Sequence, residues 1–210
     1  MKNSSIIILI LTVQTFGFAQ TNDEAGSFTY GEFRLGYGIS SFGEGLKERY
    51  DAENFSTSGG LLASVALYRK FKKIDHLNFG IKYKSLGAFP SKGDNGQELF
   101  FNYWGASASI KYFPFDKMAR KGIYLQTDYS FINQFTRKYR TVSKLEYDHQ
   151  FAIGNGIVFG LGYDMPIGAK RTMFTIGFEY EYDTRIGEVT GIGKKTFVSS
   201  NFGVLAGIKF

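Results

Sequence analysis

Acidic and basic residues recur at every second position in several stretches of this chain. The clearest stretch is 172–185, where Glu179, Glu181 and Asp183 alternate with large apolar residues. Because successive side chains of a strand point to opposite faces, the charged residues of such a stretch share one face. Taken over all the alternating stretches, the charged residues of this face are Lys70, Lys111 and the residues predicted to form an ion network, namely Glu32, Arg34, Lys82, Lys84, Asp128, Glu179, Glu181, Asp183 and Arg185. Charges of both signs on one enclosed face must be paired, so the pattern favours an ion network.

Other kinds of site chemistry find little support in the sequence. The chain has no cysteine, and its two histidines, His76 and His149, are expected at opposite ends of the fold, so we expect no metal site. The glycines of Gly154-Asn155-Gly156 resemble part of a dinucleotide-binding loop, but no helix or βαβ pattern follows them. We therefore expect no cofactor.

About eight stretches between Gly26 and Phe210 show the period-2 alternation of strands. Their ranges are 28–40, 59–71, 77–88, 99–113, 122–134, 150–163, 172–185 and 197–210. One face of each stretch is apolar and often aromatic, and the other is small, polar or charged. This pattern predicts an all-β fold, an eight-stranded antiparallel up-and-down transmembrane β-barrel. A soluble lipocalin-like barrel would show the same period with the apolar face inside, so the alternation alone does not separate the two.

The last stretch, 197–210, has an apolar face that continues to the final residue. Its members are Phe202, Val204, Ala206, Ile208 and Phe210, whereas Lys209 belongs to the opposite face. A terminal aromatic residue that closes an alternating strand resembles the signal by which outer-membrane β-barrel proteins reach their assembly machinery. This resemblance and the width of the apolar band favour the membrane barrel over the soluble one.

The first residues have the features of a cleavable export signal. Lys2 precedes an apolar run at 6–11 that is too short to span a membrane as a helix, and Ala19 suits a signal peptidase. We expect residues 1–19 to be the signal peptide and residues 20–210 to be the outer-membrane β-barrel domain.

The lengths of the connections predict the orientation of the barrel. The segments 41–58, 89–98, 135–149 and 186–196 are longer than 72–76, 114–121 and 164–171. Long outer loops and short inner turns are typical of bacterial outer-membrane barrels, so both termini are expected in the periplasm. The aromatic girdles at the two membrane surfaces are expected to include Tyr30, Trp104, Tyr112, Tyr163, Tyr180 and Tyr182.

The lumen of so small a barrel is expected to be filled and closed to ions. Arg34, Lys82, Asp128, Glu179 and Glu181 fall at similar heights in the predicted strands, so opposite charges are expected to meet across the interior. The glycines expected to make room for them are Gly36, Gly38, Gly160, Gly162, Gly203 and Gly207.

In architecture the chain resembles the small eight-stranded outer-membrane barrels, namely the OmpA and OmpX transmembrane domains and the PorT-like barrel family. The resemblance covers the whole mature chain, but no peptidoglycan-binding domain is expected after Phe210. It implies an outer-membrane protein of a Gram-negative bacterium, a non-enzymatic barrel with a structural or interaction role. The PorT-like resemblance adds the expectation of a subunit in a larger envelope or secretion assembly.

The expected partners are outer-membrane lipids and lipopolysaccharide, the barrel-assembly machinery during biogenesis, and proteins of the envelope. An expected outer loop carries Arg137, Lys138, Arg140 and Lys144, which could bind lipopolysaccharide phosphates. The formal net charge of +6 comes from basic residues scattered among acidic ones, so no nucleic-acid partner is expected.

A lipid-modifying enzyme of the deacylase or phospholipase type is the alternative function. His149 would be its general base, with Ser143, Glu146 or Asp148 nearby in the sequence. The spacing of these residues matches no motif of such enzymes, so we expect no catalytic residues.

Overall fold

The computed structural model describes residues 27–43, 58–89, 91–92, 97–140, 148–168, 172–189 and 193–210. The expected signal peptide and its cleavage site lie outside these residues, as do Ser143, Lys144 and Glu146. In the described part of the chain, no helix has the length and apolar character needed to cross a membrane.

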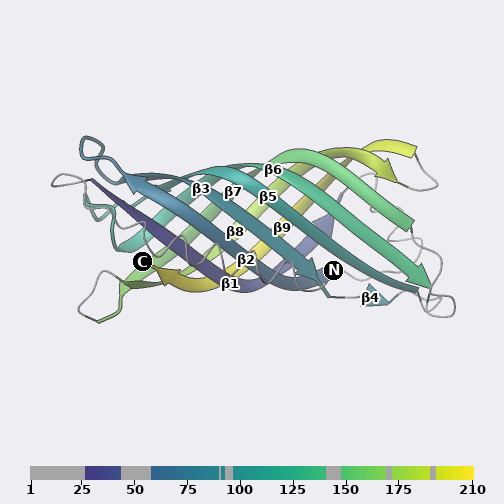
Figure 1. The fold of residues 1–210 in the computed structure, drawn as a ribbon, viewed down its shortest axis with the longest axis horizontal. Helices are drawn as coiled ribbons and strands as arrows, with labels where there is room; N and C mark the ends of the chain where they lie inside the picture. Colours follow the sequence, from purple (N-terminus) through teal and green to yellow (C-terminus); the bar gives the residue numbers. More distant parts are fainter. Residues whose placement is uncertain are drawn as a thin grey trace.

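Eight long antiparallel strands form a closed barrel (Figure 1). The strands are β1 (Phe28–Phe42), β2 (Ser58–Lys70), β3 (Leu77–Ala88), β5 (Gln97–Tyr112), β6 (Gly122–Arg140), β7 (Asp148–Pro166), β8 (Met173–Val189) and β9 (Gly193–Lys209). The pairing of β1 with β9, together with that of β3 with β5, closes the ring. The two-residue strand β4 (Ser91–Lys92) pairs with β5 beyond the end of β3. The predicted eight-stranded barrel is confirmed.

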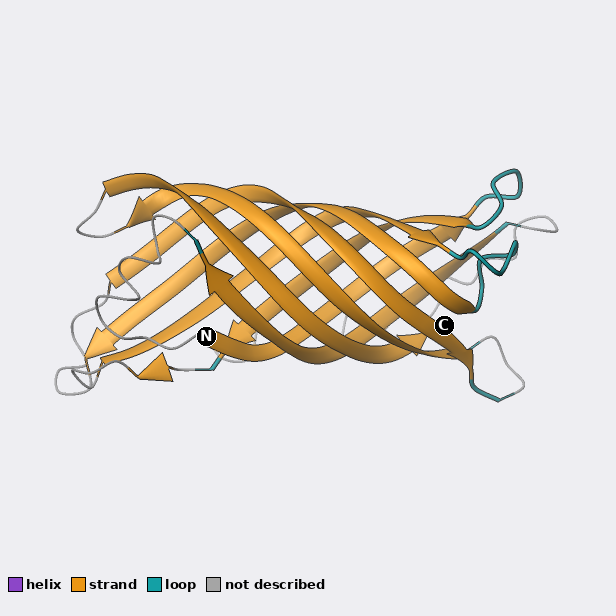
Figure 2. Cartoon of the chain, turned by 180° about the vertical axis from the view of Figure 1, so that it is seen from behind, coloured by secondary structure: helices purple, strands orange, loops and turns teal. Residues whose placement is uncertain are grey.

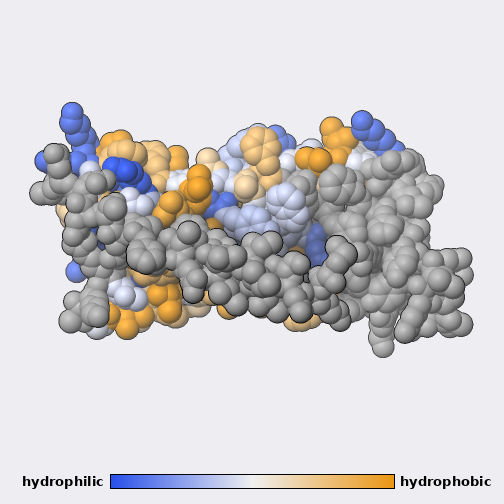
Figure 3. Space-filling view, in the orientation of Figure 1, coloured by the Kyte–Doolittle hydropathy of each residue, from blue (hydrophilic) through white to orange (hydrophobic). Residues whose placement is uncertain are grey.

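The apolar face of the barrel points outward. Large apolar side chains are exposed all around the wall, for example Ile81 at 67%, Phe131 at 64% and Phe159 at 57%. Figure 3 shows apolar side chains on the wall, mostly on the left of the face in view. The charged residues of the predicted ion network lie on the inner face and are buried. A soluble barrel would have the opposite arrangement, so the lipocalin-like alternative is wrong.

Several strands are longer than the sequence indicates. The ladder of β6 with β7 continues to the pair Lys138↔Asp148, and that of β8 with β9 continues to Val189↔Gly193. The polar residues in these extensions, such as Arg137 and Lys194, hide the apolar alternation by which a strand is recognised. The connections at this end therefore shrink to 141–147 and 190–192, and the second of these is shorter than any turn at the opposite end. The lengths of the connections at the two ends of the barrel therefore differ less than predicted.

The first strand of the barrel begins and the last strand ends at the same end of the barrel, which we call the turn end. Gly31 and Phe210 exchange two backbone hydrogen bonds there, of 2.8 and 2.9 Å. The connections 71–76 and 113–121 lie at the same end, as do the end of β7 and the start of β8, which flank the third connection (Figure 2). Tyr30 also lies near this end, but its ring is buried in the lumen against Tyr68, so its predicted place in an aromatic girdle is wrong.

Candidate functional site: the charge-filled lumen

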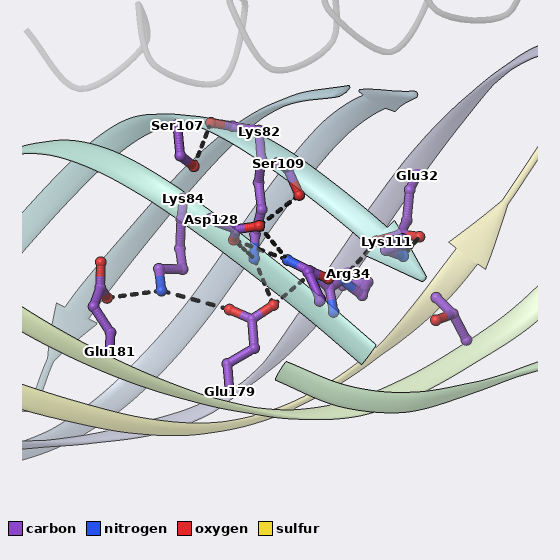
Figure 4. A network of polar contacts seen from close by, with 12 residues as sticks. Glu32, Arg34, Lys82, Lys84, Ser107, Ser109, Lys111, Asp128, Glu179 and Glu181 are labelled. Atoms are coloured by element: carbon purple, nitrogen blue, oxygen red, sulfur yellow. Dashed lines mark hydrogen bonds and ion pairs between the residues drawn. The ribbon is translucent and has the colours of Figure 1, made fainter. Parts of the chain in front are cut away.

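An ion network occupies the middle of the lumen (Figure 4). Glu179 on β8 accepts from Arg34 on β1 at 2.6 Å and from Lys82 on β3 at 2.5 Å through the same oxygen, Oε1. Lys82 also contacts Asp128 on β6 at 3.0 Å. These four side chains are at most 2% exposed. Charges from four strands therefore meet across the interior.

Towards the turn end, Glu32 continues the network. It contacts Arg34 Nε at 2.9 Å and also pairs with Lys111 on β5. The ammonium group of Lys111 lies over the rings of Tyr68 and Tyr124, at 4.8 and 4.2 Å from their centroids. The faces of both rings carry partial negative charge, which attracts the buried ammonium group and stabilises it.

Towards the opposite end, Lys84 links Glu179 to Glu181. Lys84 Nζ lies 2.7 Å from Glu181 Oε2 and 3.5 Å from Glu179 Oε2. Tyr103 donates a hydrogen bond of 2.8 Å to Glu181 Oε2. Beyond them, Asp183 accepts from Arg185 at 2.8 Å and from Asn201 at 2.9 Å.

A separate ion pair joins Lys209 to Asp164 near the turn end, at 2.9 Å. Lys209 also donates to the carbonyl oxygen of Arg120 at 2.6 Å and lies over the ring of Tyr30 at 4.2 Å. Asp164 was missed because the predicted strand ended at Tyr163. The strand continues to Pro166, and Asp164 has the inward parity of the strand.

The buried acidic and basic residues of the described part of the chain nearly balance. Six carboxylates, Glu32, Asp128, Asp164, Glu179, Glu181 and Asp183, face six basic partners, Arg34, Lys82, Lys84, Lys111, Arg185 and Lys209. A seventh buried base, Lys70, donates to the backbone carbonyls of Phe71 and Ile74. Each charge thus has the partner that burial demands.

An apolar layer fills part of the lumen beside the network. Leu62, Leu86, Tyr103 and Leu205 pack together there, each at most 3% exposed. Gly203 leaves room for the inward side chain of Leu62, because a Cβ at this glycine would lie 2.5 Å from Leu62 Cδ2.

The predicted role of the glycines is therefore only partly correct. A Cβ on Gly207 would lie 2.8 Å from Arg34 Cγ, but it would also lie 1.9 Å from the backbone carbonyl oxygen of Phe33, so the neighbouring strand is the closer constraint. Gly38 and Gly203 make room for leucines, and Gly162 lies against the ring of Tyr124. At Gly36 the constraint is the neighbouring backbone, because a Cβ there would meet the carbonyl oxygen of Val204.

The connection between β5 and β6, residues 113–121, closes the lumen at the turn end. Phe113 and Ala119 are buried against Tyr124. Asn78 donates to the carbonyl oxygen of Ala119 at 2.7 Å and to Tyr30 Oη at 3.0 Å. Ala119 has a left-handed backbone, with φ of 50°, which costs free energy that these contacts must offset. We call residues 113–121 the turn cap; nothing in the sequence predicted it.

The turn cap is held in shape by one carboxylate. Asp116 accepts hydrogen bonds from the backbone amides of Met118, Arg120 and Lys121, at 3.0, 2.8 and 3.0 Å. Partial burial alone would raise the pKa of Asp116, but these three amides favour the ionised form and hold the pKa below its ordinary value.

Two predicted sites are placed differently by the structure. Arg137, Lys138 and Arg140 belong to β6 and pair with β5, so the predicted outer loop does not begin at Phe135 and these residues are not in a loop. His149 lies in β7 with its backbone opposite Arg137. Lys144, Ser143 and Glu146 lie outside the described residues.

The predicted assembly signal lies on β9. Phe202 and Ile208 are 48% and 47% exposed on the outer face, and Val204 is 37% exposed. Ala206 shares their parity, and Phe210 follows the strand with its backbone paired to Gly31.

No family model and no curated protein matches the sequence. Solved structures do match. The attachment invasion locus protein Ail of Yersinia pestis, in complex with the heparin analogue sucrose octasulfate, superposes with a TM-score of 0.52 and 11% identity over 87% of this chain and 99% of that one. A major outer membrane protein from Thermus thermophilus gives a TM-score of 0.52 and 11% identity over 86% and 98% of the two chains. The chain therefore has the fold of the small eight-stranded outer-membrane β-barrels.

Proposed function

We propose that this protein is a non-enzymatic β-barrel of a Gram-negative outer membrane, with a structural or interaction role and without an open pore. The observation that carries this proposal is the arrangement of the two faces. The outer face is apolar, and the inner face holds paired charges at most a few per cent exposed. An apolar exterior suits lipid, and an eight-stranded barrel has an interior that side chains can fill.

The same proposal includes export and orientation. Residues 1–19 would be removed as a signal peptide, and the turn end, with both chain termini, would face the periplasm. Support for this orientation comes from the three connections at the turn end and from the long connection between β1 and β2 at the other end. Membership of a larger envelope or secretion assembly belongs to the proposal as well, and co-purification from native membranes tests it.

The experiment for the proposal is cell fractionation combined with gel migration. The protein should be recovered in the outer membrane with Gln20 as its first residue. Unboiled in detergent it should migrate differently from boiled protein, because a closed hydrogen-bonded barrel resists unfolding. A cytoplasmic species that retains Met1 and migrates identically with and without boiling would contradict the proposal.

The enzyme alternative depends on His149 alone. If the barrel is not an enzyme, replacing His149 with Ala should leave membrane lipid composition unchanged. In an enzyme that uses His149 as its general base, the same change would lower the activity by on the order of 100-fold or more. A lipid product that disappears in this variant, but not in His76→Ala, would favour the enzyme.

A further inference from the structure

Two connections of the turn end are joined to each other. The backbone amide of His76 donates to the carbonyl oxygen of Lys117 at 3.2 Å, and the amide of Phe113 donates to the carbonyl oxygen of His76 at 2.8 Å. The side chain of His76 also bonds to the carbonyl oxygen of Phe113, at 2.8 Å. The turn between β2 and β3 and the turn cap thus form one continuous surface.

This surface is basic. Five exposed basic residues lie on it or at its border with β2, namely Arg69, Lys72, Lys73, Lys117 and Lys121. The acidic residues of the same two turns are Asp75 and Asp116, and the carboxylate of Asp116 is occupied by three backbone amides. The surface therefore carries an excess of positive charge, directed away from the paired charges of the lumen.

Large apolar side chains stand beside these cations. Phe115 is 83% exposed, Met118 41%, Phe71 44% and Ile74 38%. The guanidinium group of Arg69 lies over the ring of Phe71, at 5.7 Å from its centroid. Figure 3 shows hydrophilic side chains at the turn end directly next to apolar ones. Apolar side chains next to long cationic ones suit the boundary between acyl chains and headgroups.

We propose that these residues, the basic turn surface, bind the headgroups of anionic phospholipids such as phosphatidylglycerol. The proposal rests on the proposed function, because it requires the barrel to lie in a membrane. Phe115 and Met118 would enter the acyl boundary of the leaflet, and the four lysines and Arg69 would meet the headgroup phosphates. With the turn end in the periplasm, the leaflet concerned is the inner one.

The test uses the full mature chain folded into phosphatidylcholine vesicles that contain a minor fraction of phosphatidylglycerol. The preference for the anionic lipid is measured with spin-labelled phosphatidylglycerol and spin-labelled phosphatidylcholine at the barrel surface. We expect the wild type to prefer phosphatidylglycerol by on the order of fivefold or more at low salt. The preference should fall in 1 M NaCl, where the Debye length is only about 3 Å.

The variant K72Q/K73Q/K117Q/K121Q should lose most of this preference. The matched control is Lys194→Gln, which removes an exposed lysine of β9 at the opposite end of the barrel and should keep it. Equal preference in the quadruple variant and the wild type, or an equal loss in the control, would overturn the proposal. Gel migration of the same vesicles separates the two levels: a barrel that folds and inserts but shows no lipid preference contradicts only this inference, whereas failure to insert contradicts the membrane proposal itself.

Discussion

At the scale of single residues, Glu179 has the most ion-pair partners among the described lumen charges. It contacts Arg34, Lys82 and Lys84, so its removal leaves three cations with fewer partners. We expect Glu179→Ala or Arg34→Ala to lower the free energy of unfolding by about 3–5 kcal/mol, the usual effect of stranding a buried charge. Fluorescence of Trp104, the one tryptophan of the chain, during denaturant unfolding in vesicles provides the measurement.

The matched control for this prediction is Lys194→Ala, at an exposed position of β9. It should change the free energy of unfolding by less than about 0.5 kcal/mol. The double variant Arg34→Ala/Glu179→Ala should lose less free energy of unfolding than the sum of the losses in the two single variants, because it removes both partners of one pair. Additive effects, or single variants as stable as the wild type, would mean that the pair does not form.

A second prediction at this scale concerns the terminal aromatic residue. Phe210→Ala should slow assembly into the outer membrane of living cells, because Phe210 would form the end of the assembly signal. Phe178→Ala makes the same chemical change on the outer face of β8, outside the predicted assembly signal, and should assemble normally. Lys209 is unsuitable as a comparison, because it is buried and bonded to Asp164. Equal assembly of the two phenylalanine variants would argue against a special role for the terminus.

At the scale of elements, the turn cap depends on a few hydrogen bonds to the barrel wall. Replacing Asn78 with Ala removes the bonds to Ala119 and Tyr30, so we expect the free energy of unfolding to fall by about 1–3 kcal/mol. Amide hydrogen exchange within 113–121 should also become faster than in the wild type. Ser85→Ala, on the outer face of the same strand, is the control. Unchanged exchange in Asn78→Ala would show that the cap is held by other contacts.

The turn cap should also respond to acid. The pKa of Asp116 is lower in the folded protein than in the unfolded chain, so its contribution to stability is fully present above the unfolded value. That contribution is lost as the pH falls through the folded value. Amide exchange at Met118, Arg120 and Lys121, corrected for intrinsic rates, should therefore be constant from neutral pH to about pH 5 and accelerate below about pH 4. Asp116→Ala should show fast exchange at every pH, and a wild type that exchanges equally at all pH values would refute this account.

The strands and their inward faces could be predicted from the sequence because a period of two needs only local information. That Arg34 and Glu179 point inward follows from parity. Their meeting was predicted from their similar heights in the strands, but which atoms pair depends on the register of β1 with β9 and of β9 with β8. The extensions of β6 to β9 were missed because polar residues such as Arg137 and Lys194 interrupt the apolar alternation there. The turn cap was missed because its fold depends on Asn78 and Tyr30, which are distant in the sequence.

At the scale of the whole molecule, the barrel has an apolar outer face and a mostly polar interior. The turn cap lies at the turn end of the lumen, and the network of ion pairs and the leucine layer lie beside each other within it. This arrangement leaves the outer surface and the two ends as the regions that can meet other molecules. The proposed interaction role in the envelope suits such a body, and we expect no transport of solutes through the lumen.

The most direct test of this account is single-channel recording on the pure wild-type protein in planar lipid bilayers. The same preparation should first show the change of gel migration on boiling that marks a folded barrel. The account predicts no steady conductance, because side chains fill the lumen and the turn cap covers one end. Large, stable single-channel currents would show that the lumen is open, and they would contradict the central claim.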